Sequence, residues 1–452
     1  MAKIRTSYTC QSCGALSPKW SGQCGDCNEW NSLIESIVQS KPAALRGYAG
    51  VSDTKIQTLA EVELAEISRL DTASEEFNRV LGGGLVPGSV VLVGGDPGIG
   101  KSTLLLQVMT SLSQNYTTLY ITGEESLQQV ALRAKRLEVP SDTLKIVAET
   151  QIEKITQFIL EHKPAIVVID SIQTIYTAEL QAAPGNVSQV RESTAALVRL
   201  AKQQGIAIFL VGHVTKEGAL AGPRVLEHMV DTVLYFEGDS NNRFRVVRAT
   251  KNRFGAVNEL GVFAMTDRGL KEVSNPSAIF LGHYQTNIPG SSILVSWEGS
   301  RPLLIEVQAL VDESHLSNPR RVAVGLDYNR LAMLLAILHR HGGVATYNQD
   351  VFVNVVGGVK IAETSADLPC LLAVISSLRN KPLPEKLIAF GEVGLAGEIR
   401  PVQSGQDRLK DAVKHGFERA LIPKANAPKN KIPGLEIIAI DNLQQALQFL
   451  RE

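Results

Sequence analysis

The segment GDPGIGKST, residues 95–103, constrains the fold of this chain more than any other feature of its sequence. It matches the pattern GxxxxGK[ST], follows the apolar run VVLVG and precedes the amphipathic run LLLQVMTSL. A glycine-rich loop between a strand and a helix lets backbone amides surround phosphates at the helix N-terminus. We therefore predict that Lys101 neutralises the β- and γ-phosphates of ATP and that Ser102 binds Mg²⁺. The residues expected to contact the nucleotide are Gly95, Asp96, Pro97, Gly98, Ile99, Gly100, Lys101, Ser102 and Thr103.

Short apolar runs alternate with helical patterns around this loop. The runs TTLYITGEE, AIVVIDSIQ, IAIFLVGH and DTVLYFEG are rich in β-branched residues, which is typical of a parallel sheet covered on both faces. We predict an α/β ATPase domain with a mainly parallel sheet over residues 72–273. A second α/β domain is expected over residues 291–452. We interpret residues 35–71 and 274–290 as linkers.

Polar residues at the ends of these runs are candidates for catalysis. Asp170 ends the run AIVVID, where a carboxylate reaches the magnesium shell, although an aspartate there also caps helices. Glu124 and Glu125 close LYITGEES, and we expect Glu124, with Glu125 as the alternative, to polarise the attacking water. A solvated acidic turn is the competing interpretation. His213 ends IAIFLVGH and is either a γ-phosphate sensor or a structural polar residue.

Four of the five cysteines form two CxxC pairs near the N-terminus. Cys10 and Cys13 are separated by ten residues from Cys24 and Cys27, a spacing that lets four thiolates surround one Zn²⁺ without an open position. We predict a structural zinc module over residues 1–34, and weigh a redox motif or free thiols as less fitting. Two tryptophans flank the second pair. We expect them to pack in the core of the module and cover its metal, and stacking on nucleic-acid bases is the alternative. The residues concerned are Trp20 and Trp30.

Composition limits where the chain works and what it binds. The first ten residues contain no signal-peptide pattern, and no apolar run approaches the length of a membrane span, so we expect a cytoplasmic protein that does not use a membrane. The formal net charge of −1 argues against coating nucleic acid through overall charge. Any contact with phosphates must come from local basic surface.

The motifs together resemble the bacterial RadA (Sms) family of DNA recombination proteins. The matching segments are KWSGQC between the cysteine pairs, GDPGIGKST, ITGEES, VVIDS and KNRFG at 251–255. The resemblance implies a RecA-like ATPase core, a homo-hexameric ring with ATP between subunits, and single-stranded DNA in its channel. It also implies branch migration of recombination intermediates in DNA repair and homologous recombination. The expected partners are single-stranded and branched DNA, with the recombinase RecA or a replication helicase.

A basic run leads into the KNRFG segment and ends at its third residue, Arg253. Residues 243–253 carry five basic residues and no acidic one, which fits either a solvated strand edge or a functional surface. Lys251 and Arg253 could stabilise the γ-phosphate of a neighbouring subunit like an arginine finger, or bind DNA. Two earlier segments, QAAPGNVSQVR after the run that ends in Asp170 and KEGALAGPR after the run that ends in His213, correspond in order to the DNA-binding loops of RecA-like ATPases, or are flexible surface loops with incidental charge. The predicted DNA-contact residues are Lys216, Arg224, Arg243, Arg245, Arg248, Lys251 and Arg253.

The C-terminal segments DVFVNVVGGVKIAETSADLPCLLAVISS and GEVGLAGEIRPVQSGQDRLKDAVKHG resemble the proteolytic domain of Lon. That likeness raises an ATP-dependent Ser/Lys protease as a rival function. Ser365 lies near the position of the nucleophile, but Gln406 stands where the lysine is needed, and Lys410 falls a helical turn away. We therefore predict a proteolytically inactive Lon-like domain that acts as a scaffold and DNA-binding face, with Arg400, Arg408, Lys410 and Lys414 as its basic residues.

The resulting hypothesis is a DNA-dependent ATPase that moves on single-stranded DNA and drives branch migration. Its required cofactors are ATP, Mg²⁺ and Zn²⁺. The alternative is an ATP-gated loader or scaffold for a recombinase or helicase, which binds DNA without moving it.

Overall fold

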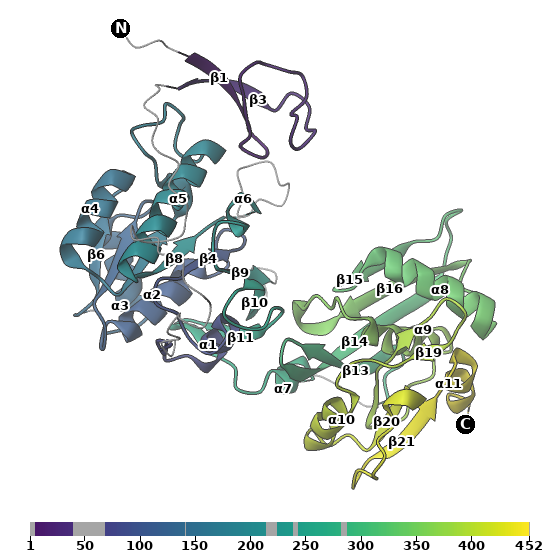
Figure 1. Cartoon of the computed structure of the whole chain (residues 1–452). Helices are drawn as coiled ribbons and strands as arrows, with labels where there is room; N and C mark the ends of the chain where they lie inside the picture. Colours follow the sequence, from purple (N-terminus) through teal and green to yellow (C-terminus); the bar gives the residue numbers. More distant parts are fainter. Residues whose placement is uncertain are drawn as a thin grey trace, which may run out of the picture. The chain divides into compact units, whose positions relative to one another are not determined.

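The computed structural model describes residues 5–38, 68–140, 142–213, 224–237, 243–281 and 287–451 (Figure 1). The chain divides into two compact units. The first comprises Met1–Phe236 with Arg243–Glu272, and the second comprises Glu237–Asn242 with Val273–Glu452. The N-terminal module and the ATPase domain belong to the first unit, and the Lon-like domain belongs to the second.

The N-terminal module is a small antiparallel sheet in the order β2-β1-β3. Its strands are β1 (Arg5–Cys10), β2 (Leu16–Ser17) and β3 (Leu33–Val38). Cys10, Cys24 and Leu33 are its buried core residues. Because β3 pairs with β1 as far as Val38, the ordered module extends four residues into the segment predicted as a linker.

A nine-stranded sheet forms the centre of the ATPase domain, in the order β12-β11-β10-β9-β4-β8-β7-β5-β6. Strands β9, β4, β8, β7, β5 and β6 run parallel, which confirms the predicted α/β class with a mainly parallel sheet. Strands β10, β11 and β12 extend the sheet on one side as an antiparallel meander. The strands are β4 (Val90–Gly94), β5 (Thr118–Thr122), β6 (Lys145–Ala148), β7 (Ile166–Asp170), β8 (Ala207–Val211), β9 (Thr232–Glu237), β10 (Phe244–Asn252), β11 (Leu260–Thr266) and β12 (Gly269–Glu272).

Helices cover both faces of this sheet, as continuous apolar strands require. Every residue of β4, β5, β7 and β8 is buried. Helices α1, α2 and α3 share one apolar core with the sheet, and α4, α5 and α6 share the other. The helices are α1 (Glu75–Leu81), α2 (Lys101–Leu112), α3 (Leu127–Arg136), α4 (Ile152–His162), α5 (Val187–Gln204) and α6 (Arg224–Glu227).

Two glycines bring distant parts of the ATPase domain into backbone contact. Gly82 ends α1 with a φ of +83°, a conformation that favours glycine. A Cβ atom on Gly255, the last residue of KNRFG, would lie 2.6 Å from the Cα of Gly82. Asn252 extends the contact by donating from Nδ2 to the carbonyl of Val80 at 3.4 Å. The KNRFG segment is therefore held directly against the end of α1.

The Lon-like domain contains a seven-stranded mixed sheet in the order β15-β16-β14-β13-β17-β20-β21, and β18 and β19 form a separate pair. Helix α9 packs on β13 and β14, while α8 contacts α9 and α11. The strands are β13 (Ser291–Glu298), β14 (Arg301–Glu313), β15 (Arg321–Val324), β16 (Gln349–Val355), β17 (Leu387–Ala389), β18 (Glu392–Val393), β19 (Ile399–Arg400), β20 (Arg419–Pro423) and β21 (Glu436–Ile440). The helices are α7 (Pro276–Phe280), α8 (Tyr328–Gly342), α9 (Asp367–Leu378), α10 (Gly405–Lys414) and α11 (Leu443–Phe449).

The predicted linker over residues 274–290 is wrong in part. It contains helix α7, which packs on β14, and Phe280 is 1% exposed. The Ser277 hydroxyl accepts a hydrogen bond from the backbone N–H of Leu304 at 3.1 Å. The short apolar pattern PSAIF was not sufficient to predict this helix, because its burial depends on contact with β14, which lies outside the predicted linker.

Candidate nucleotide and zinc sites

The predicted phosphate-binding loop connects the C-terminal end of β4 to the N-terminus of α2. Gly95, Gly98 and Gly100 have φ values of +146°, +75° and +119°, which residues with side chains rarely adopt. A Cβ atom on Gly95 would lie 2.9 Å from the Cβ of Phe236. The glycines therefore permit both the turn and its close packing, and they leave backbone amides at a helix N-terminus for an anion.

Lys101 is the first residue of α2, and its side chain folds into the loop. It is 3% exposed, and Nζ donates to the carbonyl oxygens of Gly95 and Asp96 at 2.7 and 2.8 Å. Burial lowers the pKa of Lys101 to about 8, against the opposing effect of Asp170, Glu124 and Asp96. Phosphate oxygens would replace these neutral carbonyls with charged acceptors, so the buried ammonium favours nucleotide binding.

Asp170 ends β7 beside the loop and is 7% exposed. The Tyr120 hydroxyl on the neighbouring strand β5 donates to its Oδ2 atom. Among the described residues no donor to Oδ1 is found, which leaves an oxygen that can face a cation. Together with the Ser102 hydroxyl in the first turn of α2, this carboxylate fits the oxygen ligands that Mg²⁺ prefers.

Glu124 lies in the same site, directly after β5. Its Oε1 atom accepts a hydrogen bond from the Ser171 hydroxyl and lies 3.0 Å from Nε2 of His213. The contact with His213 lowers the pKa of Glu124, Ser171 and Lys101 act in the same direction, and partial burial opposes them. The carboxylate is therefore ionised at neutral pH, as a group that polarises water must be.

Glu125 has a different environment, although it is the next residue. Its carboxylate forms an ion pair with Arg133 on α3, and its backbone N–H donates to the Thr122 hydroxyl at 3.0 Å. The two candidate glutamates thus separate: Glu124 is grouped with Ser171 and His213, whereas Glu125 anchors a helix. This arrangement favours Glu124 over Glu125 for the water-polarising role.

Lys251 and Arg253 lie at the opposite end of the sheet from the loop. Lys251 donates from Nζ to the carbonyl oxygens of Glu227 and Val230, at 2.5 and 2.9 Å. Arg253 contacts the buried carboxylate of Asp231 at 3.3 Å. Asp231 precedes β9, and its Oδ2 atom accepts from the backbone N–H of Val90 at the start of β4. The loop follows the other end of β4, so the five residues of that strand, about 16 Å, separate the two groups.

The remaining predicted DNA-contact residues are not equivalent. Arg245 and Arg248 are 3% and 8% exposed, and Nε of Arg245 donates to the carbonyl of Ile99 in the phosphate loop at 3.0 Å. Buried guanidinium groups cannot meet DNA phosphates, so the prediction for these two residues is corrected. Arg243 is exposed. Lys216 lies outside the described residues, and of Arg224 only its backbone at the start of α6 is described.

The four N-terminal cysteines converge on one point. Their sulfur atoms all lie within 4.8 Å of one another, with Cys10–Cys27 and Cys13–Cys24 separations of 3.6 and 3.7 Å. A tetrahedron with Zn–S bonds of about 2.3 Å has edges of about 3.8 Å, so the four sulfur atoms fit Zn²⁺. Gly14 and Asn28, each following a CxxC pair, have positive φ values of +75° and +58° that turn the chain around the site.

The prediction that the two tryptophans pack in the core of this module is wrong. Trp20 and Trp30 are 58% and 69% exposed. The thiolates, together with Leu33, supply the core instead. A module that is stabilised by metal ligands does not need large side chains to cover its centre.

In the Lon-like domain, Ser365 has no lysine partner among the described residues. It is fully buried, and its hydroxyl donates to Oε2 of Glu363 at 2.8 Å. Arg408, also fully buried, forms an ion pair with Glu363 and lies 3.5 Å from the Ser365 hydroxyl. Gln406 is exposed, and Lys410 pairs with Asp407 in solvent. An arginine cannot act as the base of a Ser/Lys dyad, because it stays protonated. Burial also removes Arg408 from the predicted DNA-binding face.

Comparison with known proteins decides the family. Over its full length the chain is 64% identical to the DNA repair protein RadA of Pseudomonas aeruginosa, which it also covers completely. The chain belongs to the RadA family of DNA repair proteins. It is 57% identical to the RadA protein of Escherichia coli, with 99% of each chain covered, and 45% identical to that of Aquifex aeolicus, with complete coverage of both.

Models of three domain families match separate parts of the chain. An AAA domain matches residues 57–219, a rubredoxin metal binding domain matches residues 8–35, and subunit ChlI of Mg-chelatase matches residues 332–426. Family membership and these matches confirm the ATP-binding ATPase domain, the four-cysteine zinc module and the Lon-like domain. No described helix is long and apolar enough to cross a membrane.

Sequence reasoning missed several residues that organise the site. Tyr120 binds Asp170, Ser171 binds Glu124, and Arg133 binds Glu125. Asp231, which holds Arg253, lies directly before the run TVLYFE. Only Asp231 had a sequence signal, as an acidic residue at the start of an apolar strand; the others depend on which strands are neighbours.

Proposed function

We propose that this chain is a DNA-dependent ATPase that translocates on single-stranded DNA and promotes branch migration of recombination intermediates. The observation that carries the proposal is the position of Lys251 and Arg253. They lie at the far end of the sheet from the phosphate loop of their own subunit. Cations so placed are useful for hydrolysis only if a second subunit supplies the nucleotide.

This arrangement supports the homo-hexameric ring that we propose, because it offers a cation to the nucleotide of a neighbouring subunit. The Arg253 side chain is 57% exposed, while its partner Asp231 is 2% exposed and is also bound by Lys202 at 2.7 Å. Asp231 thus holds one nitrogen of the Arg253 guanidinium, while more than half of the side chain is exposed and can reach the γ-phosphate of a neighbouring subunit. There it would stabilise the charge of the transition state. Lys251, held by two carbonyls, would support the same segment.

Within each subunit, Lys101 and the loop amides hold the phosphates, and Ser102 and Asp170 bind Mg²⁺. Glu124 orients the attacking water. His213 contacts Glu124 and is followed directly by the predicted DNA-binding segment of residues 214–224. We expect loss of the γ-phosphate to change the environment of Glu124, and through it that of the histidine that adjoins this segment. This link is how we expect turnover to be coupled to DNA.

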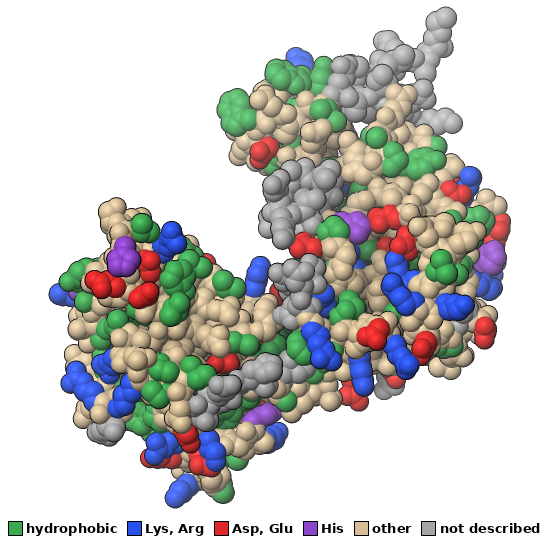
Figure 2. Space-filling model, turned by 180° about the vertical axis from the view of Figure 1, so that it is seen from behind, with side chains coloured by type: hydrophobic (Ala, Val, Ile, Leu, Met, Phe, Trp, Pro, Cys, Tyr) green, Lys and Arg blue, Asp and Glu red, His purple; other side chains and the backbone are tan. Residues whose placement is uncertain are grey.

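DNA contact is proposed for exposed basic residues only. Arg243 and Arg253 remain candidates, with Lys216 and Arg224 in or beside the segment that follows His213. Figure 2 shows basic and acidic side chains interspersed over the visible face. This distribution agrees with the net charge of −1 and with local contacts to phosphates. We expect binding to be independent of sequence and to weaken as salt rises.

The test follows a three-stranded recombination joint under ATP and Mg²⁺, comparing the intact chain with Lys101→Ala and Arg253→Ala. The motor proposal requires the junction to move only with the intact chain, while both variants still bind DNA. If the intact chain binds DNA and hydrolyses ATP but leaves the junction in place, it is an ATP-gated loader for a recombinase such as RecA or for a helicase. Peptidase activity is not proposed, given the environment of Ser365.

A further inference from the structure

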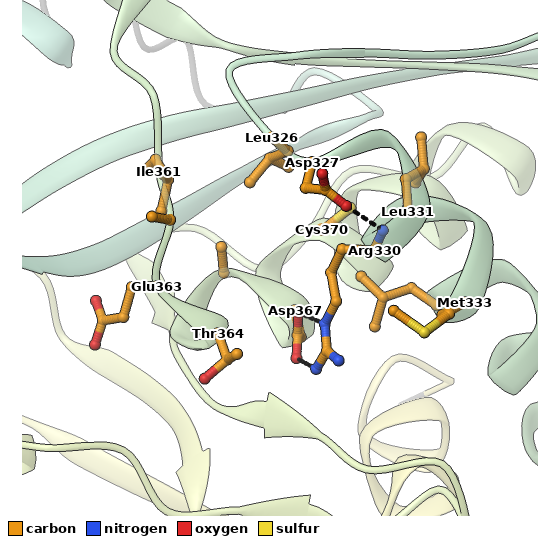
Figure 3. A pocket seen from close by; sticks show the side chains of 13 residues that line it. Leu326, Asp327, Arg330, Leu331, Met333, Ile361, Glu363, Thr364, Asp367 and Cys370 are labelled. Carbon is orange, nitrogen blue, oxygen red and sulfur yellow. Dashed lines mark hydrogen bonds and ion pairs between the residues drawn. The ribbon is translucent and has the colours of Figure 1, made fainter. Parts of the chain in front are cut away.

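A cavity of about 260 Å³ opens in the Lon-like domain, and its lining includes Thr364 and Ala366, the neighbours of Ser365 in the chain (Figure 3). It lies between α8, the segment 361–366 and the first turn of α9. Its inner surface is apolar and includes Leu331, Leu334, Ile361 and Cys370. Since these residues are all buried from bulk water by the fold, the cavity offers an apolar side chain a preformed site.

One wall of the cavity is polar and fixed. Nε of Arg330 donates to Oδ1 of Asp367 at 2.9 Å, and Nη2 contacts Oδ2 and also the carbonyl of Val393. The backbone N–H of Val393 donates to the same carboxylate at 3.0 Å. Among the described residues, Nη1 of Arg330 has no acceptor, and the side chain is 29% exposed. Figure 3 shows this end of the guanidinium turned away from Asp367. It is a donor without a protein partner at the cavity wall.

The charge balance around the cavity is negative. Arg330 is matched by Asp367, and Glu363 is matched by the buried Arg408. This leaves the carboxylate of Asp327 at the rim, where one oxygen accepts from the backbone N–H of Arg330 at 2.8 Å and caps α8. A phosphate or an anionic lipid would meet this carboxylate with like charge. A neutral or basic ligand would not be repelled by the carboxylate of Asp327.

We propose that this cavity binds one large apolar side chain of a partner polypeptide, with a basic residue beside it. The main-chain carbonyl of the bound segment would accept from Nη1 of Arg330, and the basic side chain would face Asp327. The volume is below the roughly 300–1,000 Å³ of sites for small molecules and suits a single side chain. Ser365 is buried against Glu363, so the segment is held without being cleaved. This binding site is independent of the proposed motor function.

A methionine gives a local probe for this proposal. Met333 lines the mouth of the cavity and is 41% exposed, and the other four methionines of the chain all precede residue 273. Methyl-labelled methionine in the full-length chain therefore reports on this cavity through one NMR signal, assigned by Met333→Leu. The probe is the blocked peptide Ac-Gly-Lys-Leu-Lys-Gly-NH₂. Its matched peptides carry glycine in place of leucine, or glutamate in place of lysine.

The expected result is a saturable shift of the Met333 signal with the leucine peptide. Removing the apolar side chain should weaken binding about tenfold or more, because its burial provides most of the affinity. Ala362→Trp, which fills the mouth at an exposed position, should abolish the shift. Ala336→Trp is the matched control on the exposed part of α8 outside the cavity, and should preserve it.

Three outcomes would overturn the proposal. One is a Met333 signal that none of the peptides moves. Another is a shift of the Met333 signal by the leucine peptide that is as large in the Ala362→Trp chain as in the intact chain. The third is a response to single-stranded DNA but not to the peptides, which would make the cavity part of a nucleic-acid surface. Because no ATP is present, failure here leaves the proposed ATPase function untouched.

Discussion

Replacing Arg253 with alanine should leave folding nearly unchanged and remove most ATP turnover. The side chain is 57% exposed, and its contact with Asp231 is a single 3.3 Å ion pair. Asp231 keeps Lys202 at 2.7 Å and the backbone N–H of Val90 at 3.1 Å. Because Arg253 is more than half exposed and Asp231 keeps these two other partners, the pair contributes about 1 kcal/mol to the free energy of unfolding. Loss of an arginine finger lowers kcat by about 1,000-fold or more.

The assay that isolates this effect mixes two inactive variants. Neither Lys101→Ala nor Arg253→Ala should hydrolyse ATP by itself. In a mixed ring, the intact loop of an Arg253→Ala subunit can face the intact Arg253 of a Lys101→Ala subunit. With random mixing of equal amounts, about a quarter of the interfaces are complete, so part of the DNA-stimulated turnover should return.

The reasoning fails if turnover by Arg253→Ala stays near that of the intact chain. It also fails if the mixture recovers nothing although the two variants assemble together, because an arginine that acts within its own subunit cannot be complemented. Arg199→Ala is the control, since it removes another partly exposed ion pair, with Glu192, far from the proposed interface residues along the chain. It should change neither stability nor turnover appreciably.

Further predictions concern the nucleotide site, the zinc module and the Lon-like domain. Glu124→Gln should lower kcat by about 100-fold or more while ATP binding is retained, and Glu125→Gln should have a much smaller effect on kcat. His213→Ala should raise the pKa of Glu124, because its hydrogen bond to that carboxylate is lost. The acid limb of the pH profile of ATP turnover should therefore move to higher pH. Lys101→Met should increase the free energy of unfolding of the nucleotide-free chain, by about 3 kcal/mol at most below pH 8. Because the folded pKa of Lys101 is about 8 and the unfolded value 10.5, this gain should decline as pH rises from 8 to 10.5, as urea titrations would show. Cys24→Ser should reduce bound zinc measured by elemental analysis and expose residues 5–38 to proteolysis. Arg408→Met should destabilise the Lon-like domain by about 1–3 kcal/mol in urea unfolding, because the carboxylate of Glu363, whose side chain is 24% exposed, would lose the hydrogen bonds of its buried partner, and it should not create peptidase activity.

The sequence predicted those features in which local pattern and long-range structure agree. The phosphate loop carries its own strand, turn and helix signals, so its residues and the parallel sheet around it could be inferred directly. The zinc site is likewise local, since four thiols within a short segment have few other uses. The class of the C-terminal domain followed from its resemblance to Lon.

Other features depend on contacts that no local pattern contains. The basic run at 243–253 looked uniform, yet β10 is buried on both faces from Arg245 to Arg248, while Arg253 lies after the strand and stays exposed. Glu124 and Glu125 are adjacent in sequence, but the turn after β5 directs one to Ser171 and the other to Arg133. The tryptophans of the zinc module were expected inside because of their size, but Cys10, Cys24 and Leu33 form its core without them.

The contact between Gly82 and Gly255 makes the segment that carries the proposed arginine finger rigid relative to α1. No side chain lies between the backbones of Gly82 and Gly255. This contact therefore cannot adjust by a change of side-chain rotamer when the segment that carries Arg253 moves. Helix α1 and this segment should therefore move as one body when a neighbouring subunit binds or releases nucleotide. A force on the Arg253 side chain would be transmitted to α1, near the start of the ATPase domain.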